Sequence, residues 1–251
     1  MDLDPRLAAL RPLGGFFVLR AAADAATDPS RPLPTLADAY ADTRSDVYGI
    51  PLTFRVELVA RRLRAPEPRV SASIAQQGLA ARLWSAALGC AALYGRVPDL
   101  DPRLLRWDPE AGAPDDLWLT EVRALPATAA VLADTVLHTH LGPLGEALRA
   151  RYGIAAGLLW GNAGSALAGA ARALERWARG SGRGDVAGRA RALTADLFAH
   201  PLLSPTGTFA EAAFRRRSCC LYYRVPGGGL CGDCCFSRPP YSSPRAPSGP
   251  P

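Results

Sequence analysis

Apolar residues recur at helical spacing in the middle of the chain. The positions that repeat at steps of three or four residues are Leu79, Leu83, Ala86 and Cys90. This spacing places them on one face of an α-helix, and Ser73 with Gln76 three residues later matches a capping box. The pattern predicts a helix over residues 73–94, with Cys90 as a buried core thiol.

Helical patterns also occur on both sides of this segment. Thr35 is placed to open a short helix, and the apolar and charged residues of 53–64 should end as a helix before the Pro66 and Pro68 pair. After Pro126 the predicted helices span residues 127–139, 142–151, 158–180 and 186–199.

The longest uncharged stretch, residues 152–171, is long enough to cross a bilayer. It contains Asn162, Ser165 and five glycines, so we interpret it as a tightly packed core helix. Small residues recur on one of its faces at Gly157, Gly161, Gly164 and Ala168. Such a face lets another backbone approach closely.

Strand patterns are short and few. Between residues 95 and 125, apolar runs at 104–107 and 117–122 flank an acidic loop and predict a two-stranded ribbon. Residues 13–20 are compatible with a short strand, and residues 201–214 are expected to form a loop. The fold class predicted is α+β, a predominantly α-helical body with a small β element.

Composition and charge exclude several classes of protein. The 251 residues are 49% hydrophobic with a formal net charge of +6, as expected for a globular chain of one large domain. The arginines are spread along the chain with no nucleic-acid recognition motif, so we expect no nucleic-acid partner. No basic segment precedes an apolar run at the N-terminus, so we expect a cytoplasmic protein without an integral membrane segment.

Cysteines are concentrated near the C-terminus. Five of the six fall within 17 residues, at Cys219, Cys220, Cys231, Cys234 and Cys235. In a chain without an export signal, such a cluster indicates a metal or iron–sulfur site rather than a disulfide framework. The expected organisation is a helical body over 1–214, a cysteine segment over 215–236, and a disordered tail rich in proline and serine over 237–251.

The spacing of four of these cysteines is CC-x10-CxxC. A Cys-x-x-Cys turn brings two sulfurs to one metal, whereas adjacent cysteines need an irregular backbone because their side chains diverge. Four thiolates suit either tetrahedral zinc or an iron–sulfur cluster. A structural zinc site and a Cys219–Cys220 disulfide therefore remain alternative interpretations at this point.

The segment RRRSCCLYYRVPGGGLCGDCCF resembles the C-terminal motif of the FhuF-like ferric-siderophore reductases. Weaker similarity at 69–88 and 158–174 extends the likeness over residues 50–236. The resemblance implies a [2Fe-2S] cluster whose ligands are Cys219, Cys220, Cys231 and Cys234. Cys235 departs from the family pattern, which leaves a swapped ligand possible.

The resemblance also implies an iron–sulfur oxidoreductase that passes one electron to a ferric siderophore and releases Fe(II) in the cytoplasm. No catalytic residue beyond the cluster is then required. GGGLCG at 227–232 lies between cysteines rather than between a strand and a helix, so it is no dinucleotide site. An external electron donor of the ferredoxin or flavin reductase type is therefore expected. The alternatives are an electron carrier with no chelate site and a structural zinc-binding protein.

Arginines and histidines are further candidates. The arginines that bracket the cysteines are Arg215, Arg216, Arg217, Arg224 and Arg238, and the first four are the candidates for a role at the site. They could raise the cluster potential, hold an anionic ferric chelate, or form only a solvated basic run. His138 and His140 diverge on a helix with no third ligand nearby in sequence, so we expect surface or capping roles for them.

Overall fold

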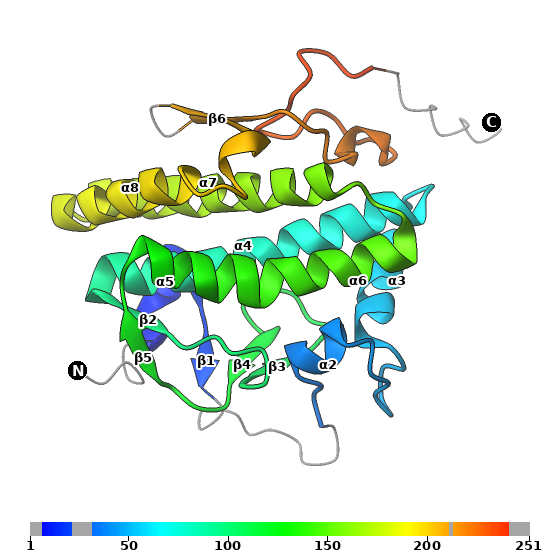
Figure 1. The fold of residues 1–251 in the computed structure, drawn as a ribbon, viewed down its shortest axis with the longest axis horizontal. Helices are drawn as coiled ribbons and strands as arrows, with labels where there is room; N and C mark the ends of the chain where they lie inside the picture. Colours follow the sequence, from blue (N-terminus) through cyan, green and yellow to red (C-terminus); the bar gives the residue numbers. More distant parts are fainter. Residues whose placement is uncertain (1–6, 22–31, 211–212, 241–251) are drawn as a thin grey trace, which may run out of the picture.

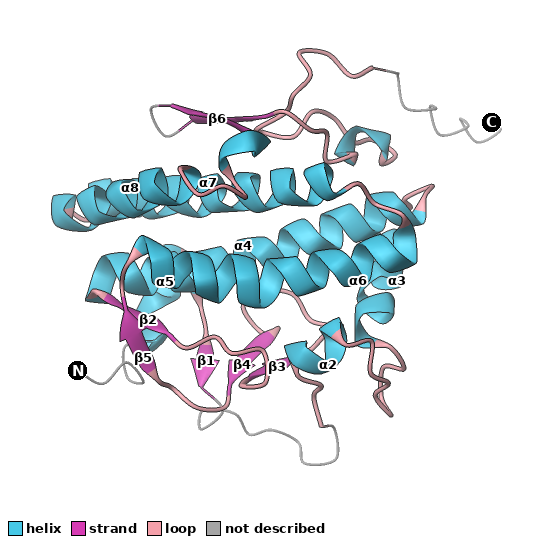
Figure 2. Ribbon diagram, in the orientation of Figure 1, coloured by secondary structure: helices cyan, strands magenta, loops and turns pink. Residues whose placement is uncertain are grey.

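The computed structural model describes residues 7–21, 32–210 and 213–240. Helices dominate, with short strands β1–β5 (residues 20–126) on one side of them and the β6–β7 pair (residues 207–216) on the other (Figures 1 and 2). The predicted α+β class with a helical body is confirmed. None of the helices within these ranges is long and apolar enough to cross a membrane.

The body is built around α4 (Pro68–Tyr94), which packs along α7 (Ala156–Gly180). Helix α8 (Gly184–Phe198) packs on both, and α3 (Pro51–Leu63) packs on α4. Burial of α4 on nearly every side explains why it is rich in alanine and leucine. Cys90 is a buried core residue on α4, as predicted, and burial raises the pKa of its thiol to about 12.

Helix α4 begins earlier than predicted, and the proposed capping box at its start is wrong. Pro68 occupies the first turn, where a missing N–H costs nothing. Ser73 lies inside the helix, and its hydroxyl donates to the carbonyl of Cys220 over 2.8 Å. Gln76 donates to the carbonyl of Leu159 over 3.3 Å. Both side chains connect helix α4 to other segments.

The remaining helices follow the predicted pattern with changes at their ends. Helix α2 (Leu36–Tyr40) opens with a capping box between Thr35 and Asp38. The predicted helix over 127–139 consists of α5 (Ala129–Ala133) and a π-helical segment, Asp134–Leu141, and α6 (Gly142–Tyr152) follows.

The π-helical segment turns His140 into the core, where it is completely buried. Its Nδ1 lies 2.8 Å from the hydroxyl of Tyr40, and its Nε2 lies against the carbonyl of Leu100. Burial lowers the pKa of His140 to about 4. The prediction of a surface or capping role is therefore wrong for His140, whereas His138 is exposed.

The predicted ribbon is present. Strands β3 (Leu105–Trp107) and β4 (Leu117–Leu119) pair antiparallel, and β1 (Arg20–Ala21) adds to β4 in parallel. Strands β2 (Arg96–Pro98) and β5 (Ala124–Pro126) form a second pair. The strand predicted over 13–20 is mostly wrong, because that region contains 3₁₀ turns at Ala8–Leu13 and Gly15–Phe17.

The loop predicted over 201–214 is also wrong in part. A 3₁₀ turn at Ser204–Thr206 leads to β6 (Gly207–Ala210), which pairs antiparallel with β7 (Ala213–Arg216). Figure 1 shows this pair on the far side of α7 and α8 from the small sheets. Strand β7 crosses the predicted boundary between residues 214 and 215. Described residues 237–240 form no helix or strand, and the rest of the predicted tail, 241–251, lies outside the described residues.

The small-residue face of α7 receives β7 and the residues around it. A Cβ at Gly164 would lie 2.9 Å from the Thr206 hydroxyl and 3.0 Å from the ring of Phe214. A Cβ at Gly161 would lie 2.2 Å from the Ser218 hydroxyl. Close packing against this face is confirmed at these two positions, but the approaching atoms belong to side chains and not to the predicted backbone, and a Cβ at Gly157 would meet nothing within 4 Å.

Candidate metal centre

Three cysteine thiols converge at the end of the chain. The thiol of Cys220 is within hydrogen-bonding reach of Cys219 and Cys231, although Cys231 lies on the other side of the glycine-rich loop. Hydrogen bonding with Cys220 lowers the pKa of Cys219 and raises the pKa of Cys231. Cys220 is buried, and the other two are partly exposed.

Cys234 and Cys235 complete the group. The backbone N–H of Cys234 donates to the carbonyl of Cys231 over 3.1 Å, so these two cysteines lie at the ends of one turn. The backbone N–H of Phe236 donates to the sulfur of Cys234 over 3.4 Å, and that of Leu221 donates to the sulfur of Cys219 over 3.2 Å. The hydrogen bond from Leu221 lowers the pKa of Cys219 and so favours its thiolate, the form that binds iron.

Within the described ranges, no three His, Cys, Asp or Glu side chains are grouped to hold one metal ion. A [2Fe-2S] cluster needs a different arrangement, two sulfur ligands on each of two irons. The convergence of two cysteine pairs, Cys219 with Cys220 and Cys231 with Cys234, fits that donor set.

The loop between the two cysteine pairs folds tightly. Leu221 adopts a left-handed conformation, with φ of 68°, before a 3₁₀ turn at Tyr222–Arg224. The N–H of Gly228 donates to the carbonyl of Val225 over 2.7 Å, and a Cβ at Gly228 would lie 2.4 Å from the carbonyl oxygen of Tyr222. Glycine is therefore required at position 228 so that the chain can return to Cys231.

Buried polar residues of α4 and α7 hold this segment in place. The hydroxyl of Ser73 binds the carbonyl of Cys220, and the side-chain amide of Asn162 donates to the carbonyl of Ser73 over 2.9 Å. Asn162 accepts a 2.6 Å hydrogen bond from Nη2 of Arg216. The N–H of Arg216 donates to the carbonyl of Asp233 over 3.0 Å. Sequence reasoning missed Ser73 and Asn162, because nothing in their spacing connects them to the cysteines.

The four candidate arginines occupy different environments. Arg216 is only 2% exposed, whereas Arg215 and Arg217 are exposed on either side of it. Arg224 pairs with Glu67 at the surface, which lowers the pKa of Glu67. Only Arg216, of these four, projects into the protein.

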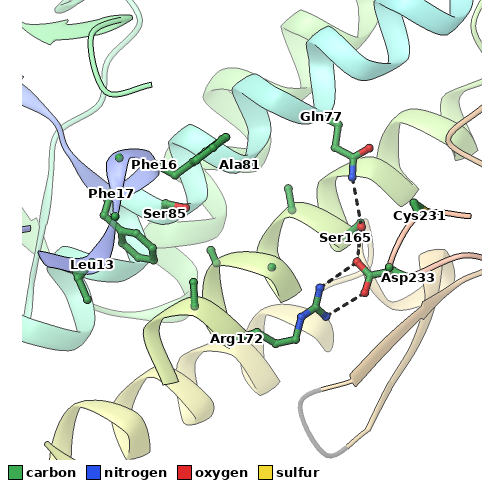
Figure 3. A pocket seen from close by; sticks show the side chains of 17 residues that line it. Leu13, Phe16, Phe17, Gln77, Ala81, Ser85, Ser165, Arg172, Cys231 and Asp233 are labelled. Carbon is green, nitrogen blue, oxygen red and sulfur yellow. Dashed lines mark hydrogen bonds and ion pairs between the residues drawn. The ribbon is translucent and has the colours of Figure 1, made fainter. Parts of the chain in front are cut away.

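A cavity of about 400 Å³ adjoins the cysteine segment (Figure 3). Its wall includes Phe16 and Phe17 from the N-terminal turns, small residues of α7, and Cys231 with Gly232 from the cysteine segment. At its rim Asp233 forms an ion pair with Arg172 over 3.0 Å and accepts a hydrogen bond from Ser165 over 2.5 Å.

Apart from Cys231, the residues named here were not among the sequence candidates for the site. Asp233 lies between two predicted ligands and could have been singled out on that ground. Nothing in the sequence connects it to Arg172, which is 61 residues away.

The cysteine centre on a helical α+β body defines an iron–sulfur protein. Residues 216–236 match the family described as the FhuF 2Fe-2S C-terminal domain, and residues 76–210, more than half of the chain, match the ferric iron reductase FhuF-like transporter family. The chain belongs to the FhuF ferric iron reductase-like family and has a [2Fe-2S] cluster as its cofactor. The family match favours this cluster over the zinc alternative. No curated protein matches the chain.

Proposed function

We propose that this protein is a cytoplasmic ferric-siderophore reductase with Cys219, Cys220, Cys231 and Cys234 as its cluster ligands. The [2Fe-2S] cluster supplies one electron at a time to the ferric ion of a bound chelate. Hard oxygen ligands hold Fe(III) far better than Fe(II), so reduction releases the iron. No acid, base or nucleophile from the protein is required.

The observation that carries this proposal is the position of the cavity. Cys231 and Gly232 form part of its wall, so a ligand inside it touches the cysteine segment directly. Phe16, Phe17 and Ala170 supply apolar surface that excludes water from the contact. At this size the cavity takes one arm of a siderophore, with the ferric centre outside and next to Cys231.

The cysteine segment also offers apolar surface to a partner. Tyr222, Leu230 and Phe236 flank the cysteines and are 37–38% exposed, so three of the five exposed large hydrophobic side chains of the described residues lie in this segment. A one-electron donor of the ferredoxin or flavin reductase type would bind over these residues and deliver electrons to the cluster.

The proposal is tested by filling the cavity. Ala173 lies on its wall, whereas Ala192 is exposed on α8 and is not among the residues that line it. Ala173→Phe should raise the KM for a ferric siderophore several-fold with little change in the cluster spectrum, and Ala192→Phe should leave both unchanged.

The same assay separates the reductase from the alternative of an electron carrier. A carrier would reduce hydroxamate, catecholate and carboxylate chelates of iron at similar rates, without saturation, and Ala173→Phe would have no effect. That result would contradict the proposal.

A further inference from the structure

Two arginines in the described ranges are almost completely buried, and they differ in their partners. Arg82 and Arg216 are each 2% exposed. Arg82 binds the carboxylate of Asp116, with Nε 2.7 Å from Oδ1, and its other nitrogens donate to backbone carbonyls near the N-terminus. The charge of Arg82 is therefore neutralised within the protein.

Arg216 has no such anion. Nε donates to the carbonyl of Ser218 over 2.9 Å, and Nη2 donates to Asn162 and to the carbonyl of Leu158. All three acceptors are neutral. Nη1 is buried and has no hydrogen-bond partner among the described residues, and no described carboxylate lies within ion-pair distance of the guanidinium. The carboxylate of Asp233, whose backbone binds Arg216, is paired with Arg172 instead.

A buried charge without a counter-ion is strongly unfavourable, so a position like this normally has an anion close by. The guanidinium lies against the cysteine segment. Its Nε donates to the carbonyl of Ser218, the residue before Cys219, and the backbone N–H of Arg216 donates to the carbonyl of Asp233, between Cys231 and Cys234. The anionic groups of a loaded [2Fe-2S] centre in this segment are its thiolates and sulfides.

We propose that Arg216 is the buried counter-charge of the [2Fe-2S] cluster and sets its reduction potential, with Nη1 left free to donate to a sulfur of the loaded centre. This inference rests on the ligand set of the proposed function. Four thiolates, two ferric ions and two sulfides give the oxidised cluster a charge of −2, and one electron takes it to −3 without a proton. A fixed cation nearby stabilises the reduced form more than the oxidised form and so raises the potential.

The backbone holds the guanidinium in this position. Strand β7 alternates exposed and buried residues, so that Phe214 and Arg216 face α7 while Arg215 faces outward. A Cβ at Gly161 would lie 3.1 Å from Nη2, and glycine therefore leaves the room that the side chain needs. Arg216 acts as a positioning and tuning residue rather than a catalytic one, since the cluster carries the electron.

The test is a redox titration of the holoprotein, followed by visible and EPR spectra. Arg216→Gln should lower the potential enough to change the one-electron equilibrium constant at least tenfold, a shift of about 59 mV. Arg216→Lys keeps the charge and should retain most of the wild-type potential. Arg217→Gln removes an exposed neighbouring charge, and its smaller effect should disappear at high salt because exposed charges are screened.

Arg216→Gln with the same potential as Arg217→Gln would overturn the inference. If Arg216→Gln cannot hold the cluster, the iron and sulfide content of Arg216→Lys is measured instead. Arg216→Lys protein that contains the cluster supports the charge role, and Arg216→Lys protein without the cluster contradicts it. The two proposals fail separately. If Arg216→Gln shows the potential shift but the wild-type protein reduces no ferric siderophore, only the proposed function is overturned.

Discussion

The helical body and the cysteine segment are stabilised in different ways. In the body, α4 and α7 bury apolar side chains against each other, and the buried charge of Arg82 has its own carboxylate. The cysteine segment contains little regular structure and is held by buried polar contacts from Ser73, Asn162 and Arg216. From this difference we expect the body to fold without the cofactor, and the segment to need the cluster as the counter-charge proposed for Arg216.

The largest predicted effect comes from replacing one cysteine in each region and comparing how much cluster each variant retains. Cys231→Ser should abolish cluster binding and ferric reduction, because oxygen is a poor replacement for a thiolate ligand of iron. Cys90→Ala, in the core of α4, should retain the cluster with some loss of stability from the cavity it creates. Iron analysis and the visible spectrum of both variants check this prediction, and a fully loaded Cys231→Ser protein would contradict it.

A second prediction concerns the pH dependence of the body. The pKa of His140 is about 4 in the folded protein and 6.5 in its ordinary state. The unfolded chain therefore binds more protons in this interval, and stability falls as the pH drops from about 6.5 to about 4. The loss attributable to His140 should approach about 3 kcal/mol.

Denaturant titrations at several pH values, monitored by helical circular dichroism, measure this effect. His140→Gln should flatten the dependence, and His138→Gln, at an exposed position, should leave it unchanged. Equal slopes for His140→Gln and wild type would show that another group is responsible.

A smaller effect on the free energy of unfolding is expected where α7 packs against the cysteine segment. Gly161→Ala should destabilise the protein by about 1–3 kcal/mol, because the added Cβ would lie 2.2 Å from the Ser218 hydroxyl. Gly157→Ala meets nothing within 4 Å and should stabilise the same helix by up to about 1 kcal/mol. The free energies of unfolding of the two variants are measured and compared. Equal values would contradict the claim that Gly161 is needed for close packing.

The smallest expected effect is at Cys235. The proposed ligand set is complete without Cys235, so Cys235→Ser should leave the iron content and the cluster spectrum unchanged. If that variant loses iron and Cys234→Ser retains it, the ligand at this end is Cys235 instead.

Periodic patterns and cysteine spacing made much of this molecule predictable. The core helices and the β3–β4 ribbon follow from regular apolar positions, and burial of Cys90 follows from the face it occupies. Ser73 and Gln76 were misinterpreted, because a serine and glutamine at capping distance look the same whether they cap a helix or bind a distant segment. His140 turned inward because of a π-helical segment, which the helical pattern did not reveal.

The residues around the cysteines were predictable only in part. The spacing identified candidate ligands, but the three arginines at 215–217 are equivalent in sequence and differ only through the alternation of β7, in a region expected to be mainly loop. The pairing of Asp233 with Arg172 and the cavity beside it depend on the tertiary fold.

The most direct test of the central claim is EPR spectroscopy of the reduced holoprotein, combined with iron and acid-labile sulfide analysis. We predict about two irons, two sulfides and one unpaired spin per chain, all lost in Cys231→Ser. Wild-type protein prepared with ample iron and sulfide that contains no labile sulfide, or whose spin signal persists in Cys231→Ser, would contradict the assignment of these cysteines as cluster ligands.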